Sequence, residues 1–242
     1  MKSIKLNTDQ YVRRFAIGDI HGCFKTFENL LEKKIKITKN DIVFLLGDYI
    51  HKGPDSQKVI DYIKKLRDND FNIYPIMGNH EDGLIKKQHS YKHTFFRFMA
   101  KLTKGEKLLL NEDEMLYFKN KSFLKTLPIH IQIEDYHFVH AGFNFEAEKP
   151  KRDYDAMLTI RKPYPTTPNK IFTKRKVVHG HTPIDLSEAK KMIDEGSRFI
   201  NLDTGCAYHK GTIPEQRDHQ GYLSCLNLDT SELIYVKNKD QI

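Results

Sequence analysis

The sequence contains no run of 18 or more apolar residues, and this absence excludes a conventional membrane-spanning helix. The N-terminal stretch MKSIKLNTDQYVRRFAIGD lacks the apolar centre of a signal peptide. Cys23, Cys206 and Cys225 show no metal-binding spacing, and their odd number argues against a disulfide framework. We therefore expect a protein of the reducing cytoplasm that has no membrane partner.

Internal repeats, low-complexity tracts and aromatic-rich basic motifs are also absent, so we do not expect nucleic acid as the partner. The net charge of +8 favours anionic ligands, although the lysines are spread along the chain and most are interpreted as solvated surface. A chain of 242 residues with 39% hydrophobic residues can bury one large core. We predict a single domain over residues 1–242.

Apolar segments that end at glycine alternate with amphipathic segments in the first third of the chain. Helical spacing of apolar residues predicts helices over 24–34 and 56–68, with Ser56 as the N-cap of the second. Apolar runs predict strands over 12–19, 41–48 and 71–81. This strand–helix–strand–helix–strand order is typical of a parallel sheet with helical connections.

The remaining sequence predicts a helical insertion at 83–127, followed by more strands and a proline-rich loop at 161–170. A hairpin about Glu134 and Asp135 is expected to join the first two of these strands. The expected strands are 128–135, 136–142, 176–183, 198–205, 221–229 and 232–238. The predicted fold class is α/β, with two mixed β-sheets packed face to face and flanked by helices.

Polar side chains of one chemical type follow five of the predicted strands, mostly beside glycines that let the backbone turn sharply. In α/β folds, functional groups gather beyond the carboxyl ends of strands. The residues are Asp19 and His21 in GDIHG, Asp48 in GDYIHKG, Asn79 and His80 in GNHE, His140 in HAG, and His181 in HGHTP.

Imidazole, carboxylate and amide groups together suit divalent manganese, iron or zinc. Two such ions need a bridging carboxylate, and together they bind a phosphoryl group and an attacking hydroxide. The many histidines disfavour calcium, and the lack of cysteine disfavours a structural zinc site. Each residue alone could be a turn former, a helix cap or a packed histidine. Turns alone do not readily explain five strand ends that carry the same chemistry.

The motifs GDIHG, GDYIHKG, GNHE, HAG and GHTP resemble, in order and spacing, the calcineurin-like metallophosphoesterase superfamily over residues 18–183. The GDIHG and GNHE forms are similar to the phosphoprotein phosphatase branch. The small size, with INLDTGCAY and TIRKPY, looks like small bacterial and phage Ser/Thr phosphatases. The resemblance implies two divalent metal ions, with manganese expected and iron or zinc as alternatives, and attack by a metal-bridged hydroxide.

The resemblance also implies a role for each motif residue: two sets of metal ligands, a proton donor to the leaving oxygen, and groups that bind the substrate phosphate. The implied metal ligands are Asp19 and His21 for the first ion, Asp48 as the bridge, and Asn79, His140 and His181 for the second. The other implied residues are His80 as the proton donor, and Lys52, Arg161 and Asn79 at the phosphate.

His51 and Lys52 depart from the family pattern GD-x-x-D-R-G, which has an acid and an arginine at these positions. In the family the acid orients the catalytic histidine, here His80. A neutral His51 can accept a hydrogen bond from His80, but it adds no negative charge. Lys52 supplies a positive charge but cannot form the bidentate hydrogen bonds that arginine makes to phosphate. We therefore expect a weakened general acid that favours good leaving groups.

Two further residues have open roles: Asp203 could order the site or form a turn, and His179 is expected to be a packed or supporting histidine. The expected function is hydrolysis of phosphomonoesters, with phosphorylated Ser/Thr proteins or small phosphoesters as substrates. The alternatives are symmetrical hydrolysis of dinucleoside tetraphosphates, a metal-binding homologue with weakened catalysis, and a nuclease. The nucleotide leaving group of the first alternative needs less acid help, which suits His51.

Overall fold

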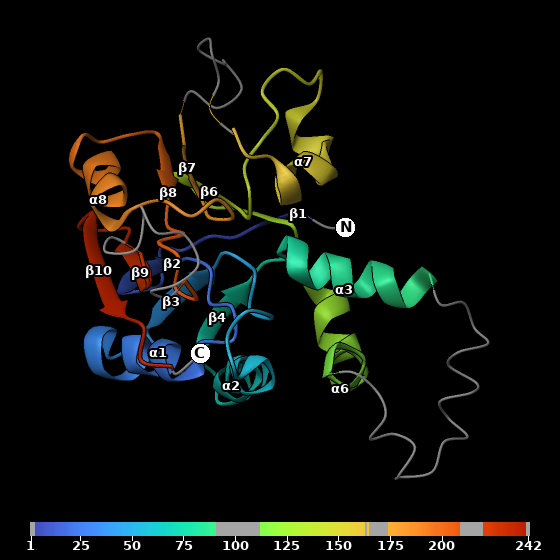
Figure 1. The fold of residues 1–242 in the computed structure, drawn as a ribbon. Helices are drawn as coiled ribbons and strands as arrows, with labels where there is room; N and C mark the ends of the chain where they lie inside the picture. Colours follow the sequence, from blue (N-terminus) through green and yellow to red (C-terminus); the bar gives the residue numbers. More distant parts are fainter. Residues whose placement is uncertain (1–2, 91–111, 163, 165–173, 209–219, 241–242) are drawn as a thin grey trace, which may run out of the picture.

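The computed structural model describes residues 3–90, 112–162, 164, 174–208 and 220–240. Within them, two five-stranded mixed sheets pack face to face, with helices on the outside, which confirms the predicted fold class (Figure 1). The single domain predicted for the whole chain stays a prediction. None of the helices in these ranges is long and apolar enough to cross a membrane.

One of the two sheets contains the parallel strands predicted for the first third of the chain. Its order is β10-β9-β2-β3-β4, with β2–β3 and β3–β4 parallel and the β9–β10 hairpin added antiparallel to β2. Its strands are β2 (Arg13–Ile17), β3 (Asp41–Leu45), β4 (Asn72–Pro75), β9 (Tyr222–Asn227) and β10 (Glu232–Lys237). We call it the β2–β4 sheet.

The other sheet, here called the β5–β8 sheet, has the order β1-β5-β6-β7-β8. The predicted hairpin joins β5 and β6 in antiparallel register, while β6, β7 and β8 run parallel. Its strands are β1 (Ser3–Lys5), β5 (His130–Gln132), β6 (Tyr136–Val139), β7 (Lys176–His179) and β8 (Phe199–Asn201). The sequence did not predict β1, which is a three-residue edge strand paired with β5.

Alternate residues of β2 and β3 point to opposite faces, and both faces are buried. Ala16 and Phe44 belong to the core between the sheets, where the Phe44 ring stacks on Phe138 of β6 with 4.1 Å between ring centroids. Phe15 and Val43 belong to the core on the opposite face of their sheet. Burial on both faces explains why these strands read as continuous apolar runs.

Helices α1 (Phe24–Asn29) and α2 (Ser56–Asp68) cover the outer face of the β2–β4 sheet (Figure 1). A π-helical segment, η1 (Leu30–Ile35), continues α1. The prediction that Ser56 caps α2 is wrong, because Asp55 is the N-cap residue and Ser56 is the first helical residue. The Ser56 hydroxyl instead accepts the backbone N–H of His51 at 3.0 Å, which fixes the loop that carries His51.

The predicted insertion 83–127 is helical where the structure describes it. Helices α3 (Asn79–Ser90) and α6 (Glu112–Thr126) pack on each other at one end of the sheets (Figure 1). Helix α3 begins inside the GNHE motif, so the predicted strand 71–81 is shorter than expected and ends at Pro75. Most of the proline-rich loop 161–170 lies outside the described residues.

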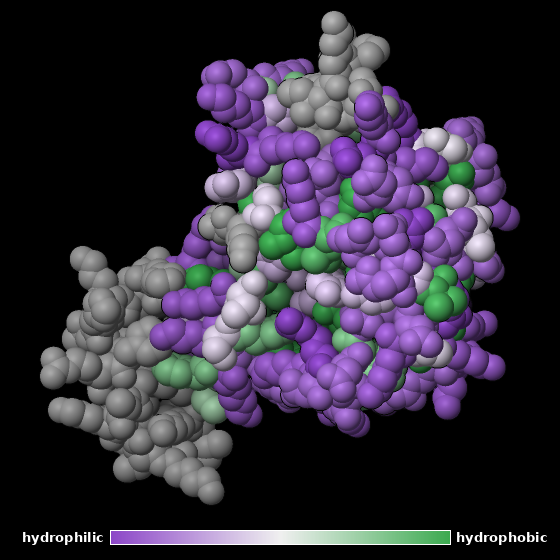
Figure 2. Space-filling model, turned by 180° about the vertical axis from the view of Figure 1, so that it is seen from behind, coloured by the Kyte–Doolittle hydropathy of each residue, from purple (hydrophilic) through white to green (hydrophobic). Residues whose placement is uncertain are grey.

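Three short helical segments were not predicted: η2 (Pro150–Arg152), α7 (Tyr154–Thr159) and α8 (Leu186–Asp194). Helix α8 packs against β8 and β10, and Ala189 and Ile193 form its buried face. The face of the molecule shown in Figure 2 is mainly hydrophilic, with hydrophobic side chains scattered between charged ones. This surface agrees with the large share of charged residues, 30% of the chain.

Candidate metal centre

The polar side chains singled out in the sequence come together where strands of both sheets end. Asp19 and His21 follow β2, Asp48 follows β3, and His140 and His181 follow β6 and β7. Asn79 and His80 open α3, just after β4. Parallel strands carry their carboxyl ends to the same edge of a sheet, and this topology brings five separate segments to one place.

A first group of metal-ligand atoms lies around one oxygen of Asp48. His21 Nε2 is 3.6 Å and His80 Nε2 is 3.8 Å from Asp48 Oδ2, and these three residues could hold one cation. His21 Nδ1 lies 3.1 Å from the carbonyl oxygen of Ile50 and donates its proton to it. Neutral His21 therefore presents a lone pair at Nε2, as a metal ligand must.

A second group lies around the other oxygen of Asp48. His140 Nε2 is 3.5 Å from Asp48 Oδ1, and Asp48, His140 and His181 could hold another cation. Asn79 Oδ1 lies 2.9 Å from both His140 Nε2 and His181 Nδ1. Because Asp48 contributes one oxygen to each group, it is placed to bridge two ions.

The second group has electron pairs that need a positive partner. His140 Nδ1 donates its proton to the carbonyl oxygen of Leu46 at 2.8 Å, and burial lowers the pKa of His140 to about 4. Neutral His140 thus directs a lone pair at Nε2 towards the amide oxygen of Asn79. Two lone pairs at this separation repel each other unless a cation lies beside them, so the donor set fits a divalent ion.

Buried carboxylates reinforce the same conclusion. Burial raises the pKa of Asp48 to about 7 and that of Asp203 to about 6, and it raises that of Asp19 well above its usual value with help from Asp203 and Asp48. Within the described residues, Asp203 Oδ2 and His181 Nε2 are buried without a hydrogen-bond partner. Divalent cations would neutralise this clustered charge, so the residues present fit the metals that the sequence predicts.

Asp19 is held in place by the loop that carries His181. Both of its carboxylate oxygens accept the backbone N–H of His181, at 3.2 and 3.3 Å. Gly180 makes this approach feasible, because a Cβ atom there would lie only 2.0 Å from Asp19 Oδ1. The glycine of the HGHTP motif thus provides the space that a carboxylate needs beside the ligands.

Glu81 is a residue of the site that the sequence reasoning did not assign. Its two carboxylate oxygens accept the backbone N–H groups of Asp48, Tyr49, Ile50 and Gly78 at 2.9 to 3.3 Å. Burial and then Asp48 raise its pKa to about 8, while these N–H groups oppose the shift. Glu81 thereby ties the Asp48 loop to the start of α3. Its place in the GNHE motif was the available signal in the sequence.

The backbone at the site is strained. His21, Asp48, His51, Lys52 and His181 are non-glycine residues with positive φ, between 49° and 74°. Such residues are uncommon, and each costs about 1 kcal/mol or more unless the surrounding structure holds it. Their concentration here indicates that the loops serve the placement of side chains rather than local stability.

His51 lies against His80. The two Nδ1 atoms are 2.8 Å apart, so one ring donates to the other. Burial, followed by the charges of Lys52 and His51, lowers the pKa of His80 to about 4. Within the described residues, no carboxylate lies at His80 Nδ1, where the family pattern implies one. The His80 Nε2 atom is 3.8 Å from Asp48 Oδ2.

Each of the predicted phosphate-binding cations lies near one of the two ligand groups. Lys52 Nζ is 2.8 Å from His21 Nε2 and 5.1 Å from the centre of the Tyr208 ring. Arg161 is exposed and close enough to His181 to lower the pKa of that imidazole, whose largest cause of lowering is burial. Lys52 and Arg161 thus place positive charge beside the ligands of both groups.

Asp203 and His179 occupy supporting positions. Asp203 Oδ1 accepts the backbone N–H of Gly205 at 3.0 Å, which is the turn role, while its charge acts on Asp19, which is the ordering role. His179 is buried beside Tyr164, with 5.7 Å between ring centroids. His179 is the last residue of β7, whereas His181 lies beyond the strand and has positive φ, so strand alternation does not relate their side chains.

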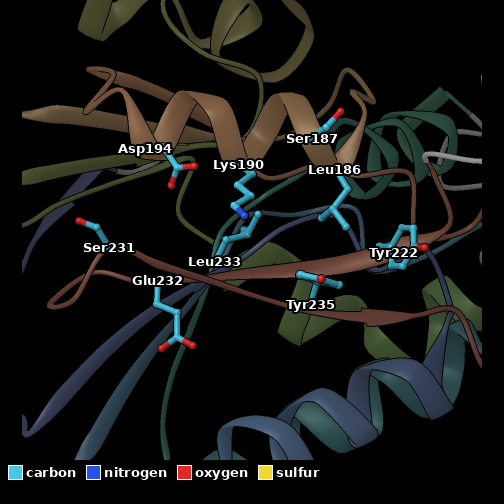
Figure 3. Close-up of a pocket in the computed structure, with 9 residues that line it drawn as sticks. All are labelled: Leu186, Ser187, Lys190, Asp194, Tyr222, Ser231, Glu232, Leu233 and Tyr235. Carbon is cyan, nitrogen blue, oxygen red and sulfur yellow. The ribbon is translucent and has the colours of Figure 1, made fainter.

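A cavity of about 500 Å³ lies elsewhere, between α8 and the β9–β10 hairpin (Figure 3). Lys190 reaches from α8 towards Leu233, and Tyr222 and Tyr235 line the strand side. None of its lining residues belongs to the predicted site, so the cavity is separate from the metal centre.

Relatives with similar sequences carry tetraphosphatase names. A protein of Wigglesworthia glossinidia brevipalpis named bis(5'-nucleosyl)-tetraphosphatase, symmetrical, is 45% identical over 71 residues, which are 29% of this chain and 25% of that protein. The chain thus matches about a quarter of that relative's length. Geobacillus thermodenitrificans has a protein named bis(5'-nucleosyl)-tetraphosphatase PrpE, asymmetrical. It is 26% identical over 222 residues, 79% of this chain and 85% of that protein.

A solved structure described as that of a candidate diadenosine tetraphosphatase shares the fold, with a TM-score of 0.63 and 22% identity over 97% of this chain and 96% of that one. The names of the relatives do not support the Ser/Thr phosphatase subtype that the motifs suggested. The comparisons do support the predicted superfamily. The family model described as calcineurin-like phosphoesterase matches residues 12–211, most of the chain, and the chain therefore belongs to the calcineurin-like phosphoesterase family.

Proposed function

We propose that this protein hydrolyses dinucleoside tetraphosphates at a phosphoric anhydride bond and uses two divalent metal ions. The observation that carries the proposal is the position of Asp48, whose two oxygens face two separate groups of ligand atoms. Paired metal sites that share a carboxylate are suited to phosphoryl transfer to water. The substrate class is inferred from the names of the relatives.

The metal ligands of the proposal are the residues that the sequence predicts. Asp19 and His21 would complete one site, Asn79, His140 and His181 the other, and Asp48 would serve both. When bound, the two cations lower the pKa of a water molecule and stabilise negative charge on the phosphoryl group. Manganese is the expected metal, with iron or zinc as alternatives, because imidazole, amide and carboxylate ligands suit all three.

The substrate phosphate would be held by groups that border the metal centre. Lys52 provides a mobile point charge and Arg161 can form two parallel hydrogen bonds to phosphate oxygens. The Asn79 amide, which faces His140 and His181, could also contact a phosphate oxygen. A substrate with four linked phosphates carries several negative charges, and these cations, on a chain of net charge +8, would help to bind it.

The proton donor of the site is better suited to cleaving an anhydride than an alkyl ester. His80 would protonate the departing oxygen, because its Nε2 points into the first ligand group. His51 beside it is an imidazole rather than a carboxylate, so it adds no negative charge next to the proton donor. A nucleotide phosphate leaves readily without full protonation, and the site is therefore better matched to it than to a serine alkoxide.

Hydrolysis of phosphorylated protein is the second candidate. It would require His51, across the 2.8 Å contact, to hold His80 as a proton donor strong enough for a poor leaving group. Under this alternative the physiological substrate would be a phosphoserine or phosphothreonine chain.

The test is a substrate panel with the metal-loaded protein. Diadenosine tetraphosphate, a phosphoserine peptide and para-nitrophenyl phosphate are each incubated with manganese, and the products are separated by chromatography. We expect diadenosine tetraphosphate to be cleaved with the highest kcat/KM. Two ADP molecules would indicate symmetrical cleavage, and ATP with AMP asymmetrical cleavage.

The matched control is Asp48→Asn, which keeps the shape of the bridging residue and removes its charge. It should abolish turnover of every substrate. Preferred cleavage of the phosphopeptide would contradict the proposal in favour of the second candidate. Metal binding without turnover of any substrate would mean that the chain is a binding module.

A further inference from the structure

A carboxylate from the helical insertion contacts His51, the partner of the proposed proton donor His80. His51 Nε2 lies 2.9 Å from Oδ1 of Asp113, in the first turn of α6, 62 positions away in the sequence. The side chains are 29% and 39% exposed, so the contact lies at the edge of the site. Asp113, His51 and His80 thus form a continuous hydrogen-bonded row that ends at the metal centre.

The chemistry of the row fixes the position of each proton. A carboxylate only accepts hydrogen bonds, so His51 donates from Nε2 to Asp113. Neutral His51 then has no proton on Nδ1 and must accept there, which requires His80 to donate from its own Nδ1. When His80 takes up a second proton, that proton is therefore carried on Nε2, the atom that lies 3.8 Å from Asp48 Oδ2, and it is the proton that passes to a leaving oxygen while the Nδ1 proton stays in the contact with His51.

We propose that Asp113 is a positioning residue, which acts through His51 to hold His80 in the tautomer and orientation that direct Nε2 to the leaving group. This inference rests on the proposed phosphoester hydrolysis and applies to any phosphate ester or anhydride cleaved at this site. The family pattern has its acid directly beside the catalytic histidine. Here the acid comes from a different part of the chain and acts across one intervening imidazole.

Helix α6 is anchored firmly enough for this role. Leu116 is buried in the core, and the buried Asn120 accepts from Lys64 at 2.6 Å and donates to Gln57 at 2.9 Å. Both partners belong to α2, so α6 is fixed to the helix that follows the His51 loop. Asp113 lies about two turns before Asn120 on the same helix and is therefore held in register with His51.

The activity test compares two aryl phosphates, para-nitrophenyl phosphate as the better and phenyl phosphate as the poorer leaving group. For Asp113→Asn we expect kcat for phenyl phosphate to fall by about 10-fold or more, while that for para-nitrophenyl phosphate changes by less than about twofold. KM should stay unchanged, because Asp113 does not touch substrate. The matched control is Asp61→Asn, which removes another helix carboxylate, one that accepts from Gln57.

A double-mutant cycle tests whether Asp113 acts through His51. His51→Asp places a carboxylate beside His80, so adding Asp113→Asn to this variant should have little further effect. Equal losses in both backgrounds would overturn the proposal, as would equal losses for both aryl phosphates. A fall with Asp61→Asn of the same size would indicate a general effect on the helices.

A spectroscopic measurement separates this inference from the proposed function. Heteronuclear NMR of the metal-free protein at neutral pH should show His51 protonated at Nε2 and His80 at Nδ1, and Asp113→Asn should change the tautomer mixture of both rings. The result does not depend on any substrate. If the expected tautomers are seen but diadenosine tetraphosphate is not cleaved, the substrate proposal fails and the positioning role stands. If His51 carries its proton on Nδ1, the positioning role is refuted whatever the substrate.

Discussion

Replacing Gly180 by alanine should damage the metal centre without damaging the fold. A Cβ atom at this position would lie 2.0 Å from Asp19 Oδ1, whereas real Cβ atoms essentially never approach within 3.0 Å. The Asp19 carboxylate and the Gly180 loop must therefore move apart by at least 1.0 Å (3.0 − 2.0). Because a displacement of about 1 Å can cost about 100-fold in rate, we expect Gly180→Ala to lower kcat/KM by about 100-fold. Its metal affinity should also fall.

The assay measures kcat/KM and manganese affinity, the latter by titration calorimetry, for Gly180→Ala and for a matched control. Gly83→Ala is that control, because a Cβ at Gly83, on α3, would meet no atom within 4 Å. It should keep wild-type activity and gain about 0.5 kcal/mol in unfolding free energy. If Gly180→Ala binds manganese and turns over substrate as the wild type does, the placement of Asp19 beside the metals is wrong.

Three further predictions concern stability, pH and substrate binding. Glu81→Ala leaves four buried N–H groups without an acceptor, and should lower the unfolding free energy of the metal-free protein by about 4 kcal/mol in urea. A loss below about 1 kcal/mol would show that Glu81 does not hold the loop. The metal-free protein should also lose stability as the pH rises from about 7.5 to 8.5, because the folded-state pKa of Glu81 is raised to about 8. The lowered pKa values of the buried histidines, His140 among them, have the opposite effect, but this effect ends about one pH unit above their ordinary value of 6.5, so thermal melts that show rising stability in this window would contradict the argument. Lys52→Arg should lower KM by up to about tenfold, because arginine can bind a phosphate through two hydrogen bonds. An unchanged KM would place Lys52 away from the phosphate.

Local patterns in the sequence predicted the parts of the fold that depend on local chemistry. The apolar runs of β2 and β3 end in glycine turns that carry Asp19 and Asp48, and the structure places these residues at one edge of the sheets. The helix over 56–68 was predicted to its ends, since apolar residues at helical spacing mark its buried face. Its cap was misassigned, because Ser56 is used by the loop of His51 instead.

The features that were missed depend on contacts between distant segments. Strand β1 has three residues and exists through pairing with β5, more than 100 positions away. Asp113 lies in a helical stretch whose periodicity says nothing about which end meets His51. Glu81 stood within a motif, but its four N–H partners come from two turns that only the folded chain brings together. Helix α8 did have a local signal, with Leu186, Ala189 and Ile193 at helical spacing.

Location of the bound ions would test the central claim most directly. Crystals of the protein grown with manganese should show, by anomalous scattering, two ions about 3.5–4 Å apart, with one oxygen of Asp48 bound to each. Metal analysis should give two ions per chain for the wild type and fewer for Asp48→Asn. A single ion, or two ions that Asp48 does not touch, would contradict the account of how this chain acts on phosphates.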